Sequence, residues 1–132
     1  MDSVMFPDQL IERRMQVDRT AIRRYADVTD DHNPIHLDPD FAAKTPMGGI
    51  IAHGMLSLSL LWQSLQATFG TERMAGVALD IRFIRPVRED DWVSAGGQRS
   101  EDDNGYQVWV RAEGGNRSEI VISGAATIGV AK

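Results

Sequence analysis

An aspartate and a histidine lie close together in a polar stretch of the chain, at a spacing suited to acid–base chemistry. Asp31 and His36 are separated by the residues HNPI. Because Pro34 disfavours helix at the residue before it and favours a turn, both side chains can face one cavity. A carboxylate and an imidazole that flank one point can hold a water molecule and move its protons. Taken alone, the pattern DxNPxH slightly favours a simpler explanation, a turn in which the histidine merely packs.

A glycine opens the apolar segment that follows. If Gly54 begins a buried helix, its backbone N–H points out of the positive end of that helix, and the missing side chain lets a ligand come close. Such an N–H can stabilise negative charge on an oxygen, where one donor is typically worth about 3 kcal/mol of barrier. A tight turn is the simpler explanation of Gly54 alone. A base, an acid and an oxyanion donor within one stretch strengthen the catalytic interpretation.

The same stretch permits two other kinds of site, which the spacing disfavours. All three histidines, with Asp31 or Asp38, could supply metal ligands: His32, His36 and His53. No HExxH or comparable spacing is present, so we expect no metal and no cofactor. Three serines lie in the apolar segment without a GxSxG elbow, which argues against a serine hydrolase: Ser57, Ser59 and Ser64.

The composition predicts a single domain over residues 1–132. Of these 132 residues, 42% are hydrophobic, which is enough for one core. The net charge of −5 argues against nucleic acid or an anionic membrane as the main partner. The absence of cysteine excludes disulfides and a thiol nucleophile. The first residues show no basic and apolar signal peptide, so we expect a cytoplasmic protein.

The apolar segment predicts one long, buried helix over residues 54–69, ended by Gly70. Leucine and aromatic residues go most of the way round it, and residues 45–71 contain no Asp, Glu, Lys or Arg. A helix of this kind is buried in protein or spans a membrane. A membrane span needs about 20 mostly apolar residues. This segment is shorter and carries six hydroxyl or amide side chains, so we expect protein on most of its sides.

The rest of the pattern predicts short helices and then an antiparallel meander. Before the long helix we expect a weak strand at 10–18, helices at 19–28 and 39–43 capped by Asp18 and Asp38, and loops at 29–34 and 44–51. After it, alternating apolar residues predict strands near 77–84, 92–98, 106–111 and 120–128, with turns at 90–91, 102–105 and 114–116. This order indicates an α+β fold whose strands wrap the uncharged helix. Since a small sheet leaves helix faces and strand edges uncovered, we also expect a homodimer.

Two motifs in this stretch identify a family resemblance. The sequence TDDHNPIHLDPDFA, followed by IIAHGM, resembles the (R)-specific enoyl-CoA hydratases, also called MaoC-like dehydratases or hydratase 2. That family reads roughly S/T-G-D-x-N-P-h-H in the loop, with h apolar, and HGM at the start of the central helix. The resemblance implies a hotdog fold, an antiparallel sheet wrapped around one long helix. It also implies dimers or larger assemblies, with the site at the subunit interface.

The resemblance assigns roles to four positions. The catalytic pair falls on Asp31 and His36, the loop-ordering asparagine on Asn33, and the oxyanion donor on the N–H of Gly54. The implied reaction is the reversible addition of water to a trans-2-enoyl thioester of coenzyme A or acyl carrier protein. The pair would hold one water molecule, and Asp31 would take its proton as the hydroxyl adds to the β-carbon. His36 would assist in positioning and in protonating the α-carbon, and the Gly54 N–H would hold the oxygen of the developing enolate.

The resemblance also predicts substrate contacts, and the chain departs from the family at two places. Asp30 replaces the usual glycine before the catalytic aspartate, and Asp tolerates such backbone angles better than most residues. Trp62 stands where some members carry a small hydroxyl residue; it either shortens the acyl tunnel or packs on the sheet. We expect substrate contacts from His53, Met55, Trp62 and Arg85. Arg85 belongs to a group of arginines that could meet the coenzyme A phosphates: Arg82, Arg85 and Arg88.

Two other functions remain open from the sequence. A hotdog acyl-CoA thioesterase would also bind its substrate at a helix N-terminus, although the DxNPxH loop favours hydration. A non-catalytic acyl-CoA-binding subunit is the second alternative. An intact Asp31 and His36 pair argues against it, whereas the aspartate at position 30 keeps it open.

Overall fold

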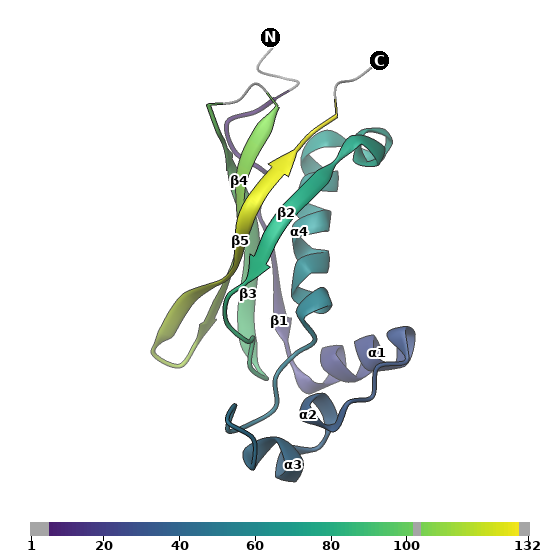
Figure 1. The fold of residues 1–132 in the computed structure, drawn as a ribbon, viewed down its shortest axis with the longest axis vertical. Helices are drawn as coiled ribbons and strands as arrows, with labels where there is room; N and C mark the ends of the chain where they lie inside the picture. The colour runs from purple at the N-terminus through teal and green to yellow at the C-terminus, as the bar shows by residue number, and fades with distance from the viewer. Residues whose placement is uncertain (1–5, 102–103, 130–132) are drawn as a thin grey trace.

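The computed structural model describes residues 6–101 and 104–129, which form a sheet with one long helix packed along it (Figure 1). The elements are, in order, β1 (Arg13–Val17), α1 (Arg19–Thr29), α2 (Pro34–Leu37), α3 (Pro39–Ala43), α4 (Gly54–Phe69), a 3-10 helix (Thr71–Gly76), β2 (Ala78–Phe83), β3 (Asp91–Arg99), β4 (Gly105–Gly114) and β5 (Arg117–Thr127). The predicted turn at Asp102 and Asp103 lies outside the described residues.

The sheet has five strands in the order β1-β3-β4-β5-β2, and each neighbouring pair is antiparallel. Hairpins join β3 to β4 and β4 to β5, whereas β2 lies at the far edge beside β5. Along β4 the buried residues alternate with exposed or half-buried ones, as a strand with one core face requires: Tyr106, Val108, Val110 and Ala112. The period-two pattern of the sequence therefore identified the strands correctly.

Helix α4 packs on the inner face of the sheet and contributes a large block of the core. It contacts β1, β3 and β4, and its apolar residues are buried along most of its circumference: Leu56, Leu58, Leu60, Leu61, Leu65 and Phe69. This burial explains why the segment is uncharged, since an ionised side chain would be costly there. The predicted helix, with the same bounds, and the predicted α+β arrangement are both confirmed.

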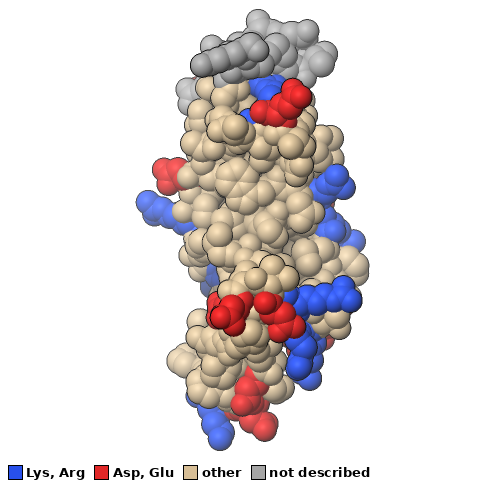
Figure 2. All heavy atoms as spheres, turned by 90° about the vertical axis from the view of Figure 1, so that its right-hand side faces the viewer, with Lys and Arg blue, Asp and Glu red and all other residues tan. Residues whose placement is uncertain are grey.

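One side of α4 is not covered by the sheet. Met55, Gln63 and Gln66 are exposed there. Figure 2 shows this side of the molecule with a broad central area free of Lys, Arg, Asp and Glu. No helix in the described part of the chain is long and apolar enough to cross a membrane.

Three local elements differ from the sequence predictions. The one-turn helix α2 and the 3-10 helix were not predicted, because each is only about one or two turns long. The first strand begins at Arg13 rather than near residue 10. The Ile11 N–H bonds the Thr68 hydroxyl of α4 at 2.8 Å, which interrupts the pairing with β3. Before this interruption, the Leu10 N–H still donates to the Gly97 carbonyl of β3 at 3.0 Å.

Candidate active site

The loop that carries the aspartate begins at a left-handed residue at the end of α1. Asp30 has φ 54° and ψ 37°, and its N–H bonds the Ala26 carbonyl. The next N–H, of Asp31, reaches the same carbonyl at 3.0 Å. A left-handed residue after a helix is most often glycine, since a side chain adds steric cost, and Asp is among the better alternatives. This explains how an aspartate can stand at the family's glycine position.

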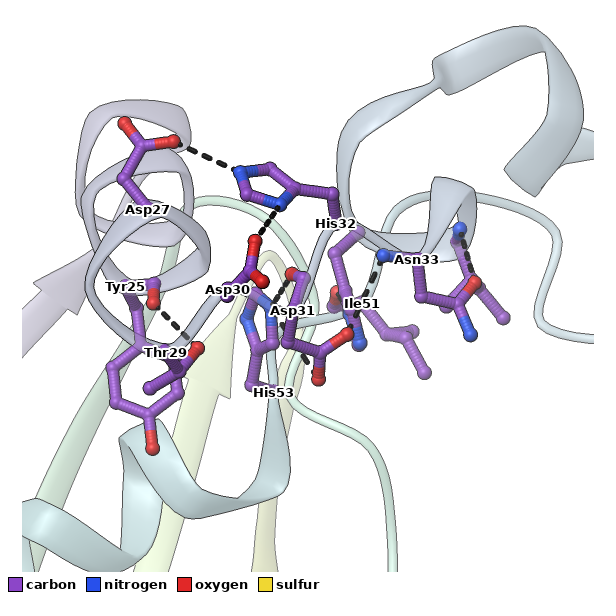
Figure 3. A network of polar contacts seen from close by, with 11 residues as sticks. Tyr25, Asp27, Thr29, Asp30, Asp31, His32, Asn33, Ile51 and His53 are labelled. Carbon is purple, nitrogen blue, oxygen red and sulfur yellow. Dashed lines mark hydrogen bonds and ion pairs between the residues drawn. The ribbon is translucent and has the colours of Figure 1, made fainter.

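The side chain of Asp30 points away from the site. It is almost fully exposed and lies 3.4 Å from Nδ1 of His32, whose Nε2 lies 3.1 Å from Asp27 on α1 (Figure 3). The second carboxylate therefore contacts an exposed histidine on the solvent side of the loop.

We expect Asp30→Gly to raise the free energy of unfolding by up to about 1 kcal/mol, because glycine adopts the left-handed conformation without steric cost. The lost contact with His32 is solvent-exposed and contributes little. Chemical denaturation measures the change, and Asp30→Ala serves as the control that removes the charge but keeps Cβ. A clear loss of stability in Asp30→Gly would show that the His32 contact outweighs the strain.

Asn33 and Pro34 build the turn that carries His36. The Asn33 side chain caps α2 by accepting from the Ile35 N–H at 3.1 Å, and Pro34 is the first helical residue. The Asn33 N–H also donates to the Asp31 carboxylate at 3.4 Å. The structure thus places Asn33 where the sequence predicted a loop-ordering residue, between the two members of the pair.

His36 is held in one tautomer by the backbone. Its Nδ1 lies 2.7 Å from the carbonyl oxygen of Ile51, on the segment that leads into α4. Since a carbonyl can only accept, Nδ1 carries the proton and the neutral ring keeps a lone pair on Nε2. The half-buried imidazole is therefore prepared to accept a proton at Nε2.

His53 lies beneath the pair rather than at a surface. It is only 4% exposed, and its Nε2 donates to the backbone carbonyl of Asp31 at 3.0 Å. Its ring stacks on His36 with centroids 3.8 Å apart. Tyr25 packs on the same ring with centroids 5.0 Å apart (Figure 3). His53 therefore fixes the backbone of Asp31 and the ring of His36, and its contact with substrate stays a prediction.

The same three side chains form a compact group that could be considered for a metal. Ligand atoms of Asp31, His36 and His53 lie within 4.8 Å of one another. However, each imidazole donates one N–H to a carbonyl, and the remaining nitrogen of His53, Nδ1, is buried. Only the carboxylate and Nε2 of His36 remain available, fewer than the three or four ligands of a zinc site. The arrangement is better suited to holding a water molecule.

A pocket of about 320 Å³ opens at the N-terminus of α4. It is lined mostly by apolar side chains from residues 47–57, 83–87 and 121–122, and Ile51 and Gly54 both contribute. Gly54 is the first residue of α4, so its N–H has no partner within the helix. A Cβ at this position would lie 3.1 Å from the Phe83 ring, so glycine leaves room that a side chain would fill.

The other predicted substrate contacts are dispersed. Arg85 lines the pocket, with its guanidinium 3.6 Å from the Glu119 carboxylate. Arg82 borders a separate hollow that the strands β2, β4 and β5 line, and Arg88 bonds the Met47 carbonyl. Met55 is exposed on the open side of α4. Trp62, two turns farther along the helix, packs half-buried against the core.

Residues 7–129 match a protein-family model described as MaoC like domain. The chain belongs to this family. Among curated MaoC-like relatives, Nodulation protein N of Rhizobium meliloti is 39% identical over 85 residues, covering 54% of this chain and 48% of the relative. The 3-hydroxybutyryl-CoA dehydratase of Methylorubrum extorquens is 35% identical over 85 residues, covering 61% and 51%. The chain spans about half the length of the curated relatives it matches.

A solved structure confirms the MaoC-like fold. The (R)-hydratase of Aeromonas caviae involved in PHA biosynthesis aligns with a TM-score of 0.72 at 25% identity, over 93% of this chain and 96% of that one. The hotdog fold implied by the motifs is therefore correct.

Sequence reasoning missed several MaoC-like site features that are now visible. The Ile51 carbonyl and the Phe83 ring carry no sequence signal. Ser57 lines the pocket, and its spacing of three from Gly54 could have indicated this.

Proposed function

We propose that this MaoC-like protein catalyses the reversible addition of water to a trans-2-enoyl thioester. The observation that carries the proposal is the way in which the structure links Asp31, His36 and the N–H of Gly54. Ile51 holds His36 through its carbonyl and lines the pocket. His53 holds Asp31 and immediately precedes Gly54. Two hydrogen bonds therefore tie the pair to the segment that leads into α4, and this segment contributes Ile51 and Gly54 to the pocket.

In the proposed reaction, the Asp31 carboxylate and Nε2 of His36 each accept a hydrogen bond from one water molecule. The oxygen of that water bonds to the β-carbon while Asp31 takes its proton. The electron pair of the double bond moves toward the thioester carbonyl, whose oxygen becomes enolate-like and accepts from the Gly54 N–H. A proton from the pair then reaches the α-carbon, so water has been added and the pair is restored.

The proposed substrate is an acyl-CoA or acyl-carrier-protein thioester. The name of the Methylorubrum relative, a 3-hydroxybutyryl-CoA dehydratase, supports a coenzyme A ester with a short acyl group. Arg85 supports an anionic carrier, because it lines the pocket with a side chain that is 61% exposed. Glu119 on β5 lies 3.6 Å from Arg85 and would compete with the carrier for this guanidinium.

Hydration of crotonyl-CoA, followed by loss of enoyl absorbance, tests the proposal. We expect turnover that yields the (R)-3-hydroxy product and that survives dialysis against a chelator. Release of free thiol from saturated acyl-CoA without hydration would instead indicate a thioesterase. Tight acyl-CoA binding with no turnover on short, long or branched enoyl esters would indicate a binding subunit.

We also propose that the protein is a homodimer. The uncharged side of α4, which exposes Met55, and the free edge of β2, where Phe83 is 52% exposed, are the surfaces that support this. Light scattering is expected to give twice the mass of the 14.6 kDa chain. A monomer at micromolar concentration would contradict the dimer.

A further inference from the structure

One hydroxyl on α4 differs from the others in its hydrogen bonding. Ser59 donates to the Leu56 carbonyl at 2.6 Å, Ser64 to the Ile11 carbonyl at 2.6 Å and Thr68 to the Ser64 carbonyl at 2.8 Å. Ser57 is 2% exposed, yet its Oγ has no partner anywhere within residues 6–101 and 104–129. The usual partner of a helical serine is a carbonyl one turn earlier, and this bond is not formed.

The serine that carries the unpaired hydroxyl lines the pocket at the helix N-terminus. Ser57 and Gly54 both line that pocket. They are three residues apart on α4, so they share one face of the helix. Helical side chains incline toward the N-terminus, which brings the Ser57 hydroxyl back over the turn that begins at Gly54.

A buried hydroxyl without a partner lowers stability unless a ligand supplies the missing hydrogen bond. The pocket is otherwise lined mostly by apolar side chains, so a bound molecule is the natural source of an acceptor. Gly54, on the same face, has an N–H without a partner inside the helix, and this N–H is also a donor. Two donors side by side are suited to a single oxygen that carries or develops negative charge.

We propose that the Ser57 hydroxyl donates a second hydrogen bond, beside the Gly54 N–H, to the thioester carbonyl oxygen of the substrate. This inference rests on the proposed hydratase function. As water bonds to the β-carbon, the electron pair of the double bond shifts and charge collects on that oxygen. Ser57 keeps its proton and donates only a hydrogen bond. It therefore stabilises the enolate more than the neutral ester.

The test compares wild type with Ser57→Ala, Ser57→Thr and Ser59→Ala in crotonyl-CoA hydration. Ser57→Ala is expected to lower kcat by about 100-fold, the usual cost of one oxyanion donor. Its affinity for saturated butyryl-CoA should change much less, because no charge develops on that ligand. Ser57→Thr keeps the hydroxyl and should recover most of the rate. Ser59→Ala, which removes a paired hydroxyl from the same helix, should leave kcat unchanged.

Thermal unfolding separates this role from a structural one. Ser57→Ala should be at least as stable as wild type, because the hydroxyl that it removes is buried and unpaired. A kcat within twofold of wild type in Ser57→Ala would overturn the inference while the hydratase function stands. Loss of stability together with loss of rate, and no recovery in Ser57→Thr, would overturn it in favour of a structural hydroxyl. A wild type inactive on every enoyl thioester would overturn both proposals.

Discussion

Replacing Asp31 with asparagine is expected to lower kcat for enoyl thioester hydration by about 1,000-fold or more. General acid–base groups typically contribute 10²- to 10⁴-fold, and the amide has nearly the same shape but cannot take a proton. The side chain is 52% exposed, and its one hydrogen bond to a backbone donor, from the Asn33 N–H, is long at 3.4 Å. The substitution should therefore leave the free energy of unfolding nearly unchanged.

The adjacent carboxylate offers a matched control for this experiment. Asp30→Asn removes the same charge one residue away, but that side chain points to His32 and solvent. It should retain kcat within about twofold, since the Asp30 carboxylate is exposed and screened by solvent, and it contacts His32 rather than the pair. His36→Ala should match Asp31→Asn, because it removes the Nε2 acceptor of the pair. Initial rates with circular dichroism on each variant give the comparison. A kcat in Asp31→Asn that stays as close to wild type as that of Asp30→Asn would exclude Asp31 as the base.

Replacing Arg117 with methionine is expected to lower the free energy of unfolding by about 3 kcal/mol, because it leaves a buried carboxylate without its counter-ion. Asp91 is 3% exposed and accepts from Arg117 Nη2 at 2.6 Å and from the Arg88 N–H at 2.9 Å. The hydrogen bond to Asp91 raises the pKa of Arg117, so the cation persists at every working pH. The bond from the Arg88 N–H to Asp91 also fixes the end of a segment whose residues 85–87 line the pocket.

Denaturant unfolding of three further variants tests whether the loss in Arg117→Met comes from the unpaired charge of Asp91. Arg111→Met changes an arginine on the neighbouring strand, whose guanidinium donates to the Ser118 hydroxyl at 3.5 Å. This substitution should cost about 0.5 kcal/mol or less. The double variant Asp91→Asn/Arg117→Met should recover part of the loss, since no charge is left buried. A double variant less stable than Arg117→Met would show that Asp91 acts through packing rather than charge. Asp91→Asn alone completes the cycle.

Local features of this protein were readable from the sequence because they depend on neighbouring residues. The uncharged run ended by Gly70 predicted α4 with its observed bounds, and Asp38 followed by Pro39 predicted the short helix through Ala43. Alternation every second residue predicted the strands of the sheet. The motif around Asp31 and His36, with the later HGM, identified the family that the comparison confirmed.

Only the tertiary structure decided how these parts meet, because the deciding contacts join residues far apart in the chain. His53 reaches the Asp31 carbonyl across 22 residues, and the Ile51 carbonyl fixes the His36 tautomer across 15. The three arginines were grouped by sequence, yet the fold sends them to different places. Which serine of α4 lacks a partner depends on which carbonyls the surrounding loops present. Hydrogen bonds and burial of this kind depend on residues that are distant in the sequence, so they cannot be predicted from local sequence patterns.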